Sequence, residues 1–186
     1  EDELCLWEKE GRRVNKLIVP IHRPFIYNLK NVISKTDISQ RDLRWLRKKM
    51  RKNNISNSDS ADKIYISRQG ADRGRKVINF EEIKQVLRKF DFKILRLEKL
   101  SFEKQLELFY NSSIVVGVHG AGLTNIIFSS NPTVIELFPR SVIKPHFYTL
   151  SKIFNFEYRS IITESQGNNL LIDIQELEDT LTEVID

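Results

Sequence analysis

The sequence predicts an α/β fold in which a mainly parallel sheet carries helices on both faces. Short apolar runs of strand length alternate along the chain with amphipathic segments of helical period. The run Ile114–Val118 is apolar at every position, as in strands that are buried on both faces. Strands separated by helices of about 10–15 residues are typical of βαβ units with right-handed crossovers. The sheet is therefore expected to be Rossmann-like.

Residues 1–62 are expected to form an N-terminal strand, a basic helix and a polar loop that belong to the domain or lead into it. KLIVP at 16–20 is apolar and has the length of a short strand. Thr36 or Asp37 can cap the helix that follows at 41–52. The polar, turn-rich stretch NNISNSDSAD then indicates a loop.

Residues 63–186 are expected to form the Rossmann-like domain itself. KIYIS at 63–67 is β-branched and aromatic, which favours a strand. The segment 79–90 repeats its apolar residues on one helical face, and Asn79 can cap that helix. Phe92–Leu97 is the next expected strand.

The same alternation continues to the end of the chain. SFEKQLELFY at 101–110 opens with a cap residue, Ser101, and places its apolar residues on one side of a helix. A helix is also expected from Gly122, after the strand 115–118. The remaining elements are strands at 133–138 and 158–162 and helices at 144–154 and 173–185.

The composition is that of one folded domain. The chain has 186 residues, of which 40% are hydrophobic and 30% charged. No uncharged apolar run approaches the ~20 residues that a membrane-spanning helix needs. The start resembles no signal peptide and lacks an initiator Met, so the chain is expected to continue upstream. Localisation stays open between the cytoplasm, a membrane surface and the lumen of the ER or Golgi. The single cysteine excludes an internal disulfide framework.

Positive charge is concentrated in the first half of the chain. Residues 1–99 contain 25 Lys and Arg against 14 Asp and Glu, whereas residues 100–186 contain 5 against 11. The excess peaks in RDLRWLRKKMRK at 41–52, where Leu43 and Leu46 indicate an amphipathic helix with a solvated basic face. An arginine-rich helix with an aromatic residue can also bind nucleic acid. A third interpretation is that the basic surface meets an anionic substrate, a membrane lipid or another domain.

The motif HGAGLT at 119–124 follows the most apolar strand and precedes a stretch of helical character. A strand, a small-residue turn and a helix start present free backbone N–H groups to an anion, and the helix dipole adds partial positive charge. Gly120 and Gly122 have no Cβ that would keep phosphate oxygens away from the backbone. A phosphate-bearing ligand is one interpretation, and a tight turn with a hydrogen-bonded histidine is the other.

Three segments are expected at one rim of the sheet, because ligands bind beyond the carboxyl ends of parallel strands. They are 67–75, 119–124 and 136–140. Arg68 directly follows a strand, so its guanidinium can reach paired phosphate oxygens across the rim. Glu136 lies in the apolar strand TVIELF, and a buried carboxylate needs a partner. That partner is either a ribose diol or a nearby arginine.

Several other sites lack their sequence signatures. No G-x-x-x-x-G-K-[ST] occurs, and HGAGLT is not G-x-G-x-x-G, so P-loop and NAD sites are disfavoured. His22, His119 and His146 are scattered, without a carboxylate–histidine pair at ligand spacing, so no metal is expected. The absence of G-x-S-x-G leaves hydrolase chemistry without a nucleophile.

The residues resemble glycosyltransferase family 61. The similarity runs from IYISRQGADRGRKVINFEEI through LEKLSFEKQLELFYNSSIVVGVHGAGLTNIIF to TVIELFP, over roughly Ile64–Pro139. Order and spacing agree with the family's Arg-ending strand, R-x-x-x-N loop, LSF-x-x-Q sequence, H-G-A-G-L-x-N turn and V-I-E strand. One position departs from the pattern, because Phe80 stands where the family usually has an acid.

The resemblance implies the C-terminal half of a two-domain GT-B glycosyltransferase, in which two Rossmann-like domains face each other. It implies a nucleotide-sugar donor, expected to be UDP-linked, and a hydroxyl of a glycan or protein acceptor. Transfer would invert configuration and use no metal or other cofactor. An N-terminal domain or a partner chain would supply the general base, so this chain alone is expected to bind nucleotide but to transfer weakly.

The family's site residues carry over onto matching positions of this sequence. Arg68 and His119 are the catalytic candidates, Arg68 for the diphosphate charge and His119 as a donor to a phosphate or sugar oxygen. Glu136 matches the family's ribose ligand. The expected nucleotide-sugar-binding residues are Arg68, Arg75, Asn79, His119, Gly120, Ala121, Gly122, Leu123, Asn125 and Glu136. Two other classes remain open: a catalytically incomplete nucleotide-binding module, and a nucleic-acid-binding domain built on 41–52.

Overall fold

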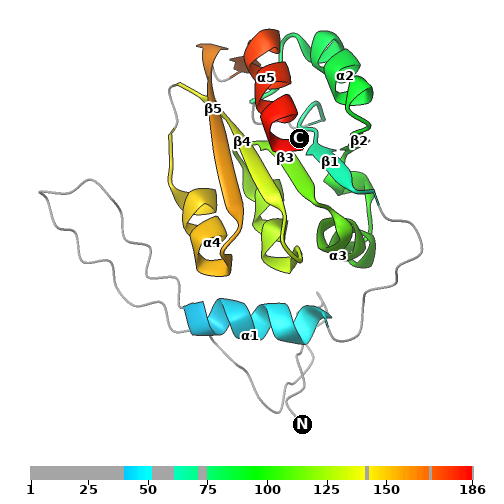
Figure 1. Cartoon of the computed structure of the whole chain (residues 1–186), viewed down its shortest axis with the longest axis vertical. Coiled ribbons are helices and arrows are strands. Elements are labelled where there is room, and N and C mark those ends of the chain that lie inside the picture. Colours follow the sequence, from blue (N-terminus) through cyan, green and yellow to red (C-terminus); the bar gives the residue numbers. More distant parts are fainter. Residues whose placement is uncertain (1–39, 52–60, 71–74, 141–142, 168, 186) are drawn as a thin grey trace, which may run out of the picture.

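A six-stranded, mostly parallel sheet forms the centre of the protein (Figure 1). The computed structural model describes residues 40–51, 61–70, 75–140, 143–167 and 169–185, so the strand expected at 16–20 lies outside the described residues. The strands are β1 (Lys63–Ile66), β2 (Lys93–Leu95), β3 (Ile114–Val118), β4 (Thr133–Pro139), β5 (Glu157–Gln166) and β6 (Asn169–Leu171). The α-helices are α1 (Gln40–Arg51), α2 (Phe80–Lys89), α3 (Phe102–Asn111), α4 (His146–Phe154) and α5 (Ile174–Ile185), and the 3₁₀ helices are η1 (Leu97–Lys99) and η2 (Ala121–Phe128).

The strands follow the order β2-β1-β3-β4-β5-β6 across the sheet. The first five pair in parallel, and β6 returns from β5 as a short antiparallel strand. The predicted α/β fold with a mainly parallel sheet is therefore confirmed. The β5–β6 hairpin was not predicted, because a three-residue strand has too few residues to show a period. The domain boundary expected at residue 62 stays a prediction.

Alternation along β1 shows how the sheet is covered on both faces. Ile64 and Ile66 belong to the core beneath α3, η2 and α4, whereas Tyr65 belongs to the core beneath α2 and α5. Successive side chains of a strand point to opposite faces, so a strand that is apolar throughout contributes to both cores. The prediction of helices on both faces is confirmed.

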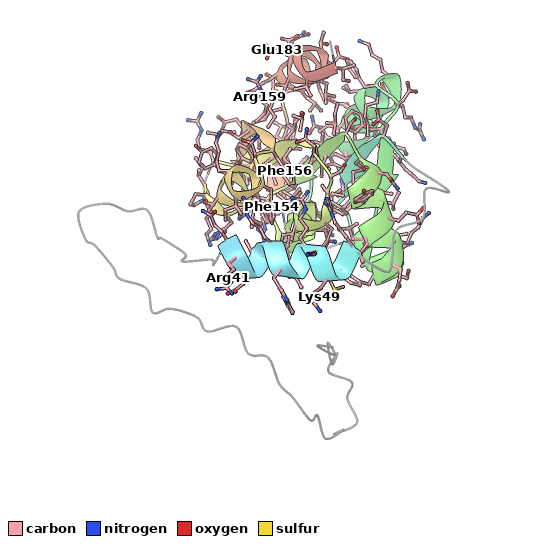
Figure 2. All side chains as sticks on the ribbon, turned by 60° about the horizontal axis from the view of Figure 1, so that its bottom comes forward. Arg41, Lys49, Phe154, Phe156, Arg159 and Glu183 are labelled. Carbon is pink, nitrogen blue, oxygen red and sulfur yellow. The ribbon has the colours of Figure 1, made fainter. Side chains whose placement is uncertain are left out.

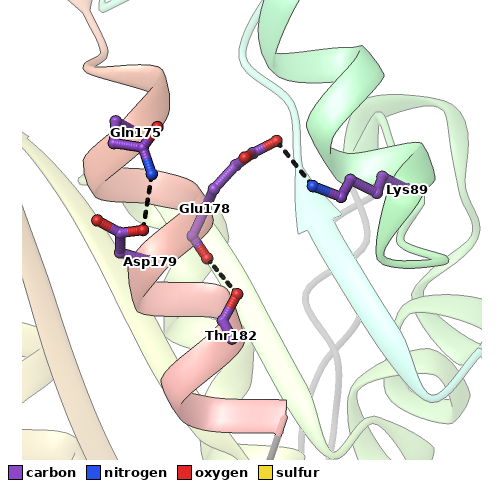
Figure 3. A network of polar contacts seen from close by, with 5 residues as sticks. All are labelled: Lys89, Gln175, Glu178, Asp179 and Thr182. Atoms are coloured by element: carbon purple, nitrogen blue, oxygen red, sulfur yellow. Dashed lines mark hydrogen bonds and ion pairs between the residues drawn. The ribbon is translucent and has the colours of Figure 1, made fainter.

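Polar side chains fix several helix ends. The Ser101 hydroxyl accepts a hydrogen bond from the Lys104 N–H (3.3 Å), as predicted for a cap of α3. Asp173 does the same for α5 through the Glu176 N–H (3.1 Å). Asn79 is the N-cap residue of α2, as predicted, but its side chain makes no cap hydrogen bond to that helix. Helices α2 and α5 lie side by side on one face, where Lys89 and Glu178 form an exposed ion pair at 3.4 Å (Figure 3).

The helix expected from Gly122 is present, and it is a 3₁₀ helix over Ala121–Phe128. A 3₁₀ helix rises about 2.0 Å per residue against about 1.5 Å for an α-helix, so the eight residues of η2 extend about 16 Å in place of about 12 Å. Its buried Leu123, Ile126 and Phe128 pack in the core on the face of the sheet that also carries α3 and α4.

Helix α1 lies across the amino ends of the strands, at the bottom of Figure 1. Its inner face carries three arginines whose guanidinium groups donate to backbone carbonyls just before β4 and β5. Arg44 bonds Ile153 O (2.6 Å), Arg47 bonds Ser129 O (2.5 Å) and Ser130 O (2.8 Å), and Arg51 bonds Phe128 O (3.1 Å) and Ser129 O. The Arg47 guanidinium also lies over the Phe154 ring, 4.6 Å from its centroid.

The expectation that the basic face of this helix is solvated is therefore only partly right. Burial, followed by the neighbouring Arg51 and Arg44, lowers the pKa of Arg47 to about 10. Arg41 and Lys49 point away from the body of the protein (Figure 2). The spacing of an amphipathic helix could not identify the arginines as the inner residues, because the carbonyls that they bind belong to segments about 80–110 residues later. None of the helices in the described part of the chain is both long and apolar enough to cross a bilayer.

Replacing Arg47 with Ala should lower the free energy of unfolding by about 1–3 kcal/mol, because Ser130 O loses its donor and Ser129 O keeps only Arg51. The matched control is Lys48→Ala, the next residue, whose side chain is exposed; its effect should stay within about 0.5 kcal/mol. Urea denaturation monitored by circular dichroism measures both. Equal effects of the two variants would contradict the docking of α1 through Arg47.

Candidate functional site

The chain changes direction across the sheet between β1 and β3. The crossover from β1 to β2 runs through α2 on one face, and the crossover from β2 to β3 runs through α3 on the other. A 2-1-3-4-5 strand order places its switch point between β1 and β3, and ligands of such sheets bind outside the carboxyl ends there. Arg68 follows β1 and His119 follows β3, so two predicted site residues lie at this point.

The guanidinium of Arg68 lies against the turn after β3. A Cβ added to Gly120 would be 2.2 Å from Arg68 Nη1, so Arg68 occupies the space that a side chain at position 120 would need. Gly120 has an extended backbone that any residue can adopt, so close approach is the reason for glycine here. The expected role of this glycine was to admit a phosphate oxygen. In the structure, the space that the missing side chain leaves is occupied by the guanidinium of Arg68, the group expected to bind the phosphate.

A second arginine reaches the same turn. Arg75 Nη1 donates to the backbone carbonyl of His119 (2.9 Å), and Arg75 has φ of 61°, a conformation that is uncommon outside glycine. Burial, followed by Arg75, lowers the pKa of Arg68, and Glu98 opposes this effect. The Nε of Arg68 has no hydrogen-bond partner in the described part of the chain. Two guanidinium groups therefore meet at the β1/β3 switch point.

Glu136 is fully buried on β4, and both of its oxygens are engaged. Oε1 lies 2.5 Å from Nδ1 of His119, and Oε2 accepts from the hydroxyl of Tyr158 on β5 (2.6 Å). The expectation of an arginine as the partner of this carboxylate is wrong. Its assignment as a ribose ligand stays a prediction, and a ribose would have to compete with these two donors.

The imidazole of His119 is held among aromatic rings. Its centroid lies 5.1 Å from that of Phe138, 5.5 Å from that of Phe147 and 6.0 Å from that of His146. The backbone N–H of His119 donates to Leu137 O (2.9 Å), so the residue continues the β3–β4 pairing. Burial, followed by His119 and Lys144, lowers the pKa of His146, and Glu136 acts in the opposite direction.

Comparison with known proteins was consistent with this arrangement. The pattern of Glycosyltransferase 61 matches residues 12–135, about two thirds of the chain. The chain belongs to glycosyltransferase family 61. It is 32% identical over 66 residues to a beta-1,2-xylosyltransferase of Arabidopsis thaliana, a match that covers 35% of this chain and 12% of that protein.

A second relative of this family 61 chain is an EGF domain-specific O-linked N-acetylglucosamine transferase of Drosophila melanogaster. The two are 36% identical over 78 residues, which cover 40% of this chain and 15% of that protein. The Xenopus laevis protein of the same name is 36% identical over 66 residues, 33% of this chain and 13% of the relative. The matches thus span less than a sixth of each relative's length.

Other residues of the family 61 motifs hold the site together without facing its arginines. The side chain of Asn79 donates to Ile172 O (2.8 Å) and accepts from the Ile172 N–H (3.2 Å), so it joins the start of α2 to the segment before α5. Asn125 donates to Gln105 Oε1 (2.7 Å). Gln105 in turn donates to two carbonyls, that of Leu97 at the start of η1 (3.0 Å) and that of Leu100 just after it (3.2 Å).

The rest of the HGAGL turn is divided between surface and core. Ala121 is exposed, whereas Leu123 is 1% exposed and packs in the core. A Cβ on Gly122 would lie 3.1 Å from side-chain atoms of both Ile66 and Leu97, so this glycine lets η2 approach β1. These contacts explain Gly122 and Leu123 by packing, and their predicted contact with nucleotide stays a prediction.

A hollow of about 530 Å³ opens beside the rim. It is lined by Gln69 and by residues 78–82 at the start of α2. Phe80, which departs from the family 61 pattern, is one of these residues. Within the described residues, no group of three His, Cys, Asp or Glu side chains could hold a metal ion.

Two residues that the sequence did not indicate contribute to the site. Tyr158 binds Glu136, and His146 stacks on His119. The sequence did indicate that Glu136, an acid in an apolar strand, needs hydrogen-bond donors. It does not indicate which residues those donors are. Tyr158 is found through the register of β4 and β5, where it lies opposite Val134, two residues before Glu136.

The basic helix of this family 61 chain lies at the opposite edge of the sheet from the site. Its arginines bind carbonyls that precede β4 and β5, whereas Arg68 and His119 follow β1 and β3. Three of its cations are thereby engaged within the protein, which disfavours the nucleic-acid interpretation of 41–52.

Two glycine substitutions should separate packing from site geometry. Gly117→Ala should destabilise the protein by about 1–3 kcal/mol, because the new Cβ meets Leu123 and Ile66 at 3.0–3.2 Å in the core. Gly120→Ala should cost less than about 1 kcal/mol, because it displaces only the end of the flexible Arg68 side chain. Thermal and urea unfolding measure both. A cost at Gly120 equal to that at Gly117 would contradict this arrangement.

Proposed function

We propose that this chain forms the nucleotide-sugar-binding part of a glycosyltransferase. The donor is a sugar linked to a nucleoside diphosphate, with UDP as the expected nucleotide, and the acceptor is a hydroxyl of a glycan or protein. The observation that supports this proposal is the meeting of Arg68 and Arg75 at the His119–Gly120 turn. Guanidinium groups bind paired phosphate oxygens and stay charged at neutral pH, so the pair fits a diphosphate.

The relatives support glycosyl transfer and limit how far the sugar can be specified. One is named for xylose and the others for N-acetylglucosamine. A pentose and an N-acetylhexosamine differ in size and in their hydrogen-bonding groups. The proposal therefore includes the class of donor, a nucleotide sugar, and leaves the sugar itself to experiment.

The proposed reaction is a single displacement with inversion. The acceptor oxygen forms a bond to the anomeric carbon while the bond from that carbon to the diphosphate oxygen breaks. The leaving nucleoside diphosphate takes the electron pair of the broken bond, so negative charge grows on its β-phosphate. Arg68, Arg75 and the N–H groups of the turn would stabilise that charge in place of a metal ion.

The acceptor proton needs a general base on the side opposite the leaving group. We assign this base to a second Rossmann-like domain that faces the carboxyl rim, as in a GT-B enzyme. This chain then contributes the donor side of the reaction. The alternative of a catalytically incomplete nucleotide-binding module differs only in lacking such a partner.

Titration with UDP, followed by isothermal calorimetry, tests the proposal. The chain should bind UDP in the micromolar range, and Arg68→Ala should weaken binding at least about tenfold, because a charged hydrogen bond contributes about 1.5–3 kcal/mol. Arg88→Ala, an exposed arginine on α2, is the matched control and should change the affinity less than about twofold.

Single-stranded DNA at two salt concentrations is the comparison ligand. Steeply salt-dependent DNA binding without a response to UDP would overturn the proposal in favour of a nucleic-acid-binding domain. UDP binding that Arg68→Ala leaves unchanged would overturn the assignment of the diphosphate to the switch point.

A further inference from the structure

A buried chain of three side chains runs from β5 to the candidate site. The Tyr158 hydroxyl lies 2.6 Å from Glu136 Oε2, and Glu136 Oε1 lies 2.5 Å from His119 Nδ1. Glu136 is fully buried and the side chain of His119 is 6% exposed. In the sheet register Glu136 stands between Gly117 and Ser160, whose small side chains flank it on β3 and β5.

The protons in this chain can be assigned from the partners. Burial, followed by the hydrogen bond to Glu136, raises the pKa of Tyr158, so its hydroxyl keeps its proton and donates to Oε2. A buried carboxylate needs donors on both oxygens. His119 Nδ1 lies within hydrogen-bond distance of Oε1, so we assign a proton to Nδ1, which donates it to the carboxylate. The ring's hydrogen bond within the described residues goes through Nδ1, so the other ring nitrogen, Nε2, is left for a ligand.

The ring cannot easily turn away from this orientation. Phe138 and Phe147 pack on it at centroid distances of 5.1 and 5.5 Å. The backbone of His119 is fixed by its bond to Leu137 O and by Arg75 on its own carbonyl. A carboxylate behind a histidine sets which nitrogen is free and stabilises the protonated ring.

We infer that Glu136 and Tyr158 are positioning residues: they hold His119 with Nδ1 donating inward, so that Nε2 is the nitrogen presented to the donor diphosphate. This inference rests on the proposed function. It gives Glu136 a role through His119 in place of a direct contact with ribose. With a proton on Nε2 as well, the ring would donate a hydrogen bond to an oxygen of the leaving diphosphate, and the charge of Glu136 would balance that of the ring.

The charges around His119 are consistent with such a donor. The groups near it come from five segments of the fold. They are Glu136 on β4, Tyr158 on β5, His146 on α4 with Lys144 before it, Arg75 at the carbonyl of His119, and Arg68 at Gly120. The cations stand on the side of the turn and the acid stands behind the ring, so an anion at the turn would complete the balance of charge.

The first test reads the ring itself and needs no ligand. Nitrogen chemical shifts of ¹⁵N-labelled histidine in the 186-residue chain report which nitrogen bears the proton. Wild-type His119 should be protonated at Nδ1, and Glu136→Gln should change this pattern because Gln is a weaker, uncharged acceptor. Tyr158→Phe should keep the Nδ1 proton but speed its exchange with solvent. Tyr148→Phe, an exposed tyrosine whose ring lies 5.4 Å from that of Tyr158, is the matched control and should leave the spectrum unchanged.

The second test separates positioning from direct contact with the nucleotide. Glu136→Gln and Tyr158→Phe should leave the affinity for uridine, which has the ribose but no phosphate, within about threefold of wild type, whereas consumption of a UDP-sugar donor by the full-length protein should fall at least tenfold in kcat. A loss of uridine affinity of tenfold or more in Glu136→Gln would identify a ribose ligand and overturn the inference. If Glu136→Gln does not fold, Tyr158→Phe decides, since it removes one hydroxyl and keeps the ring.

The two proposals fail in different ways. If wild-type protein does not bind UDP, the proposed function fails, while the nitrogen shifts still report on the positioning of His119. If UDP binds but Nδ1 of His119 carries no proton, or Glu136→Gln leaves the pattern unchanged, the inference alone is overturned.

Discussion

A carboxylate without solvent contact in the middle of a parallel sheet must receive hydrogen bonds from its neighbours. Glu136 receives them from His119 at the end of β3 and from Tyr158 on β5, so one acid joins three adjacent strands. An unpartnered carboxylate in this position would cost several kcal/mol. The orientation of His119 follows from this requirement, and with it the direction in which the site can donate a proton.

Arginines at the amino ends of the strands and arginines at the carboxyl ends make different contacts. At the amino edge, guanidinium groups of α1 bind carbonyls that would otherwise lack donors, and stack on Phe154. At the carboxyl ends of the strands, Arg68 and Arg75 lie close together. Burial and Arg75 lower the pKa of Arg68, and Glu98 opposes them. Arginines that are satisfied stabilise the fold, and arginines that are not create affinity for an anion. This difference decides which basic segment belongs to the candidate site.

Strong local patterns were sufficient for most of the fold. The helix 79–90, the cap at Ser101 and the apolar strand Ile114–Val118 all have signals within a few residues, and the structure contains each within one or two residues of its expected bounds. Patterns failed where distant contacts decide. Asn79 is the N-cap residue of α2, yet its side chain bonds Ile172, 93 residues later, in place of the helix.

The sequence by itself determined the alternation of strands and helices, the family, and the residues Arg68, His119 and Glu136 as the ones that require partners. Each follows from local spacing, or from a charge placed in an apolar run. Only the tertiary structure decided which groups they contact: Gly120 for Arg68, Glu136 for His119, and His119 and Tyr158 for Glu136. It also decided that the carbonyls before β4 and β5 bind the arginines of α1. Strand order and register bring these groups together across many residues, and no local pattern encodes them.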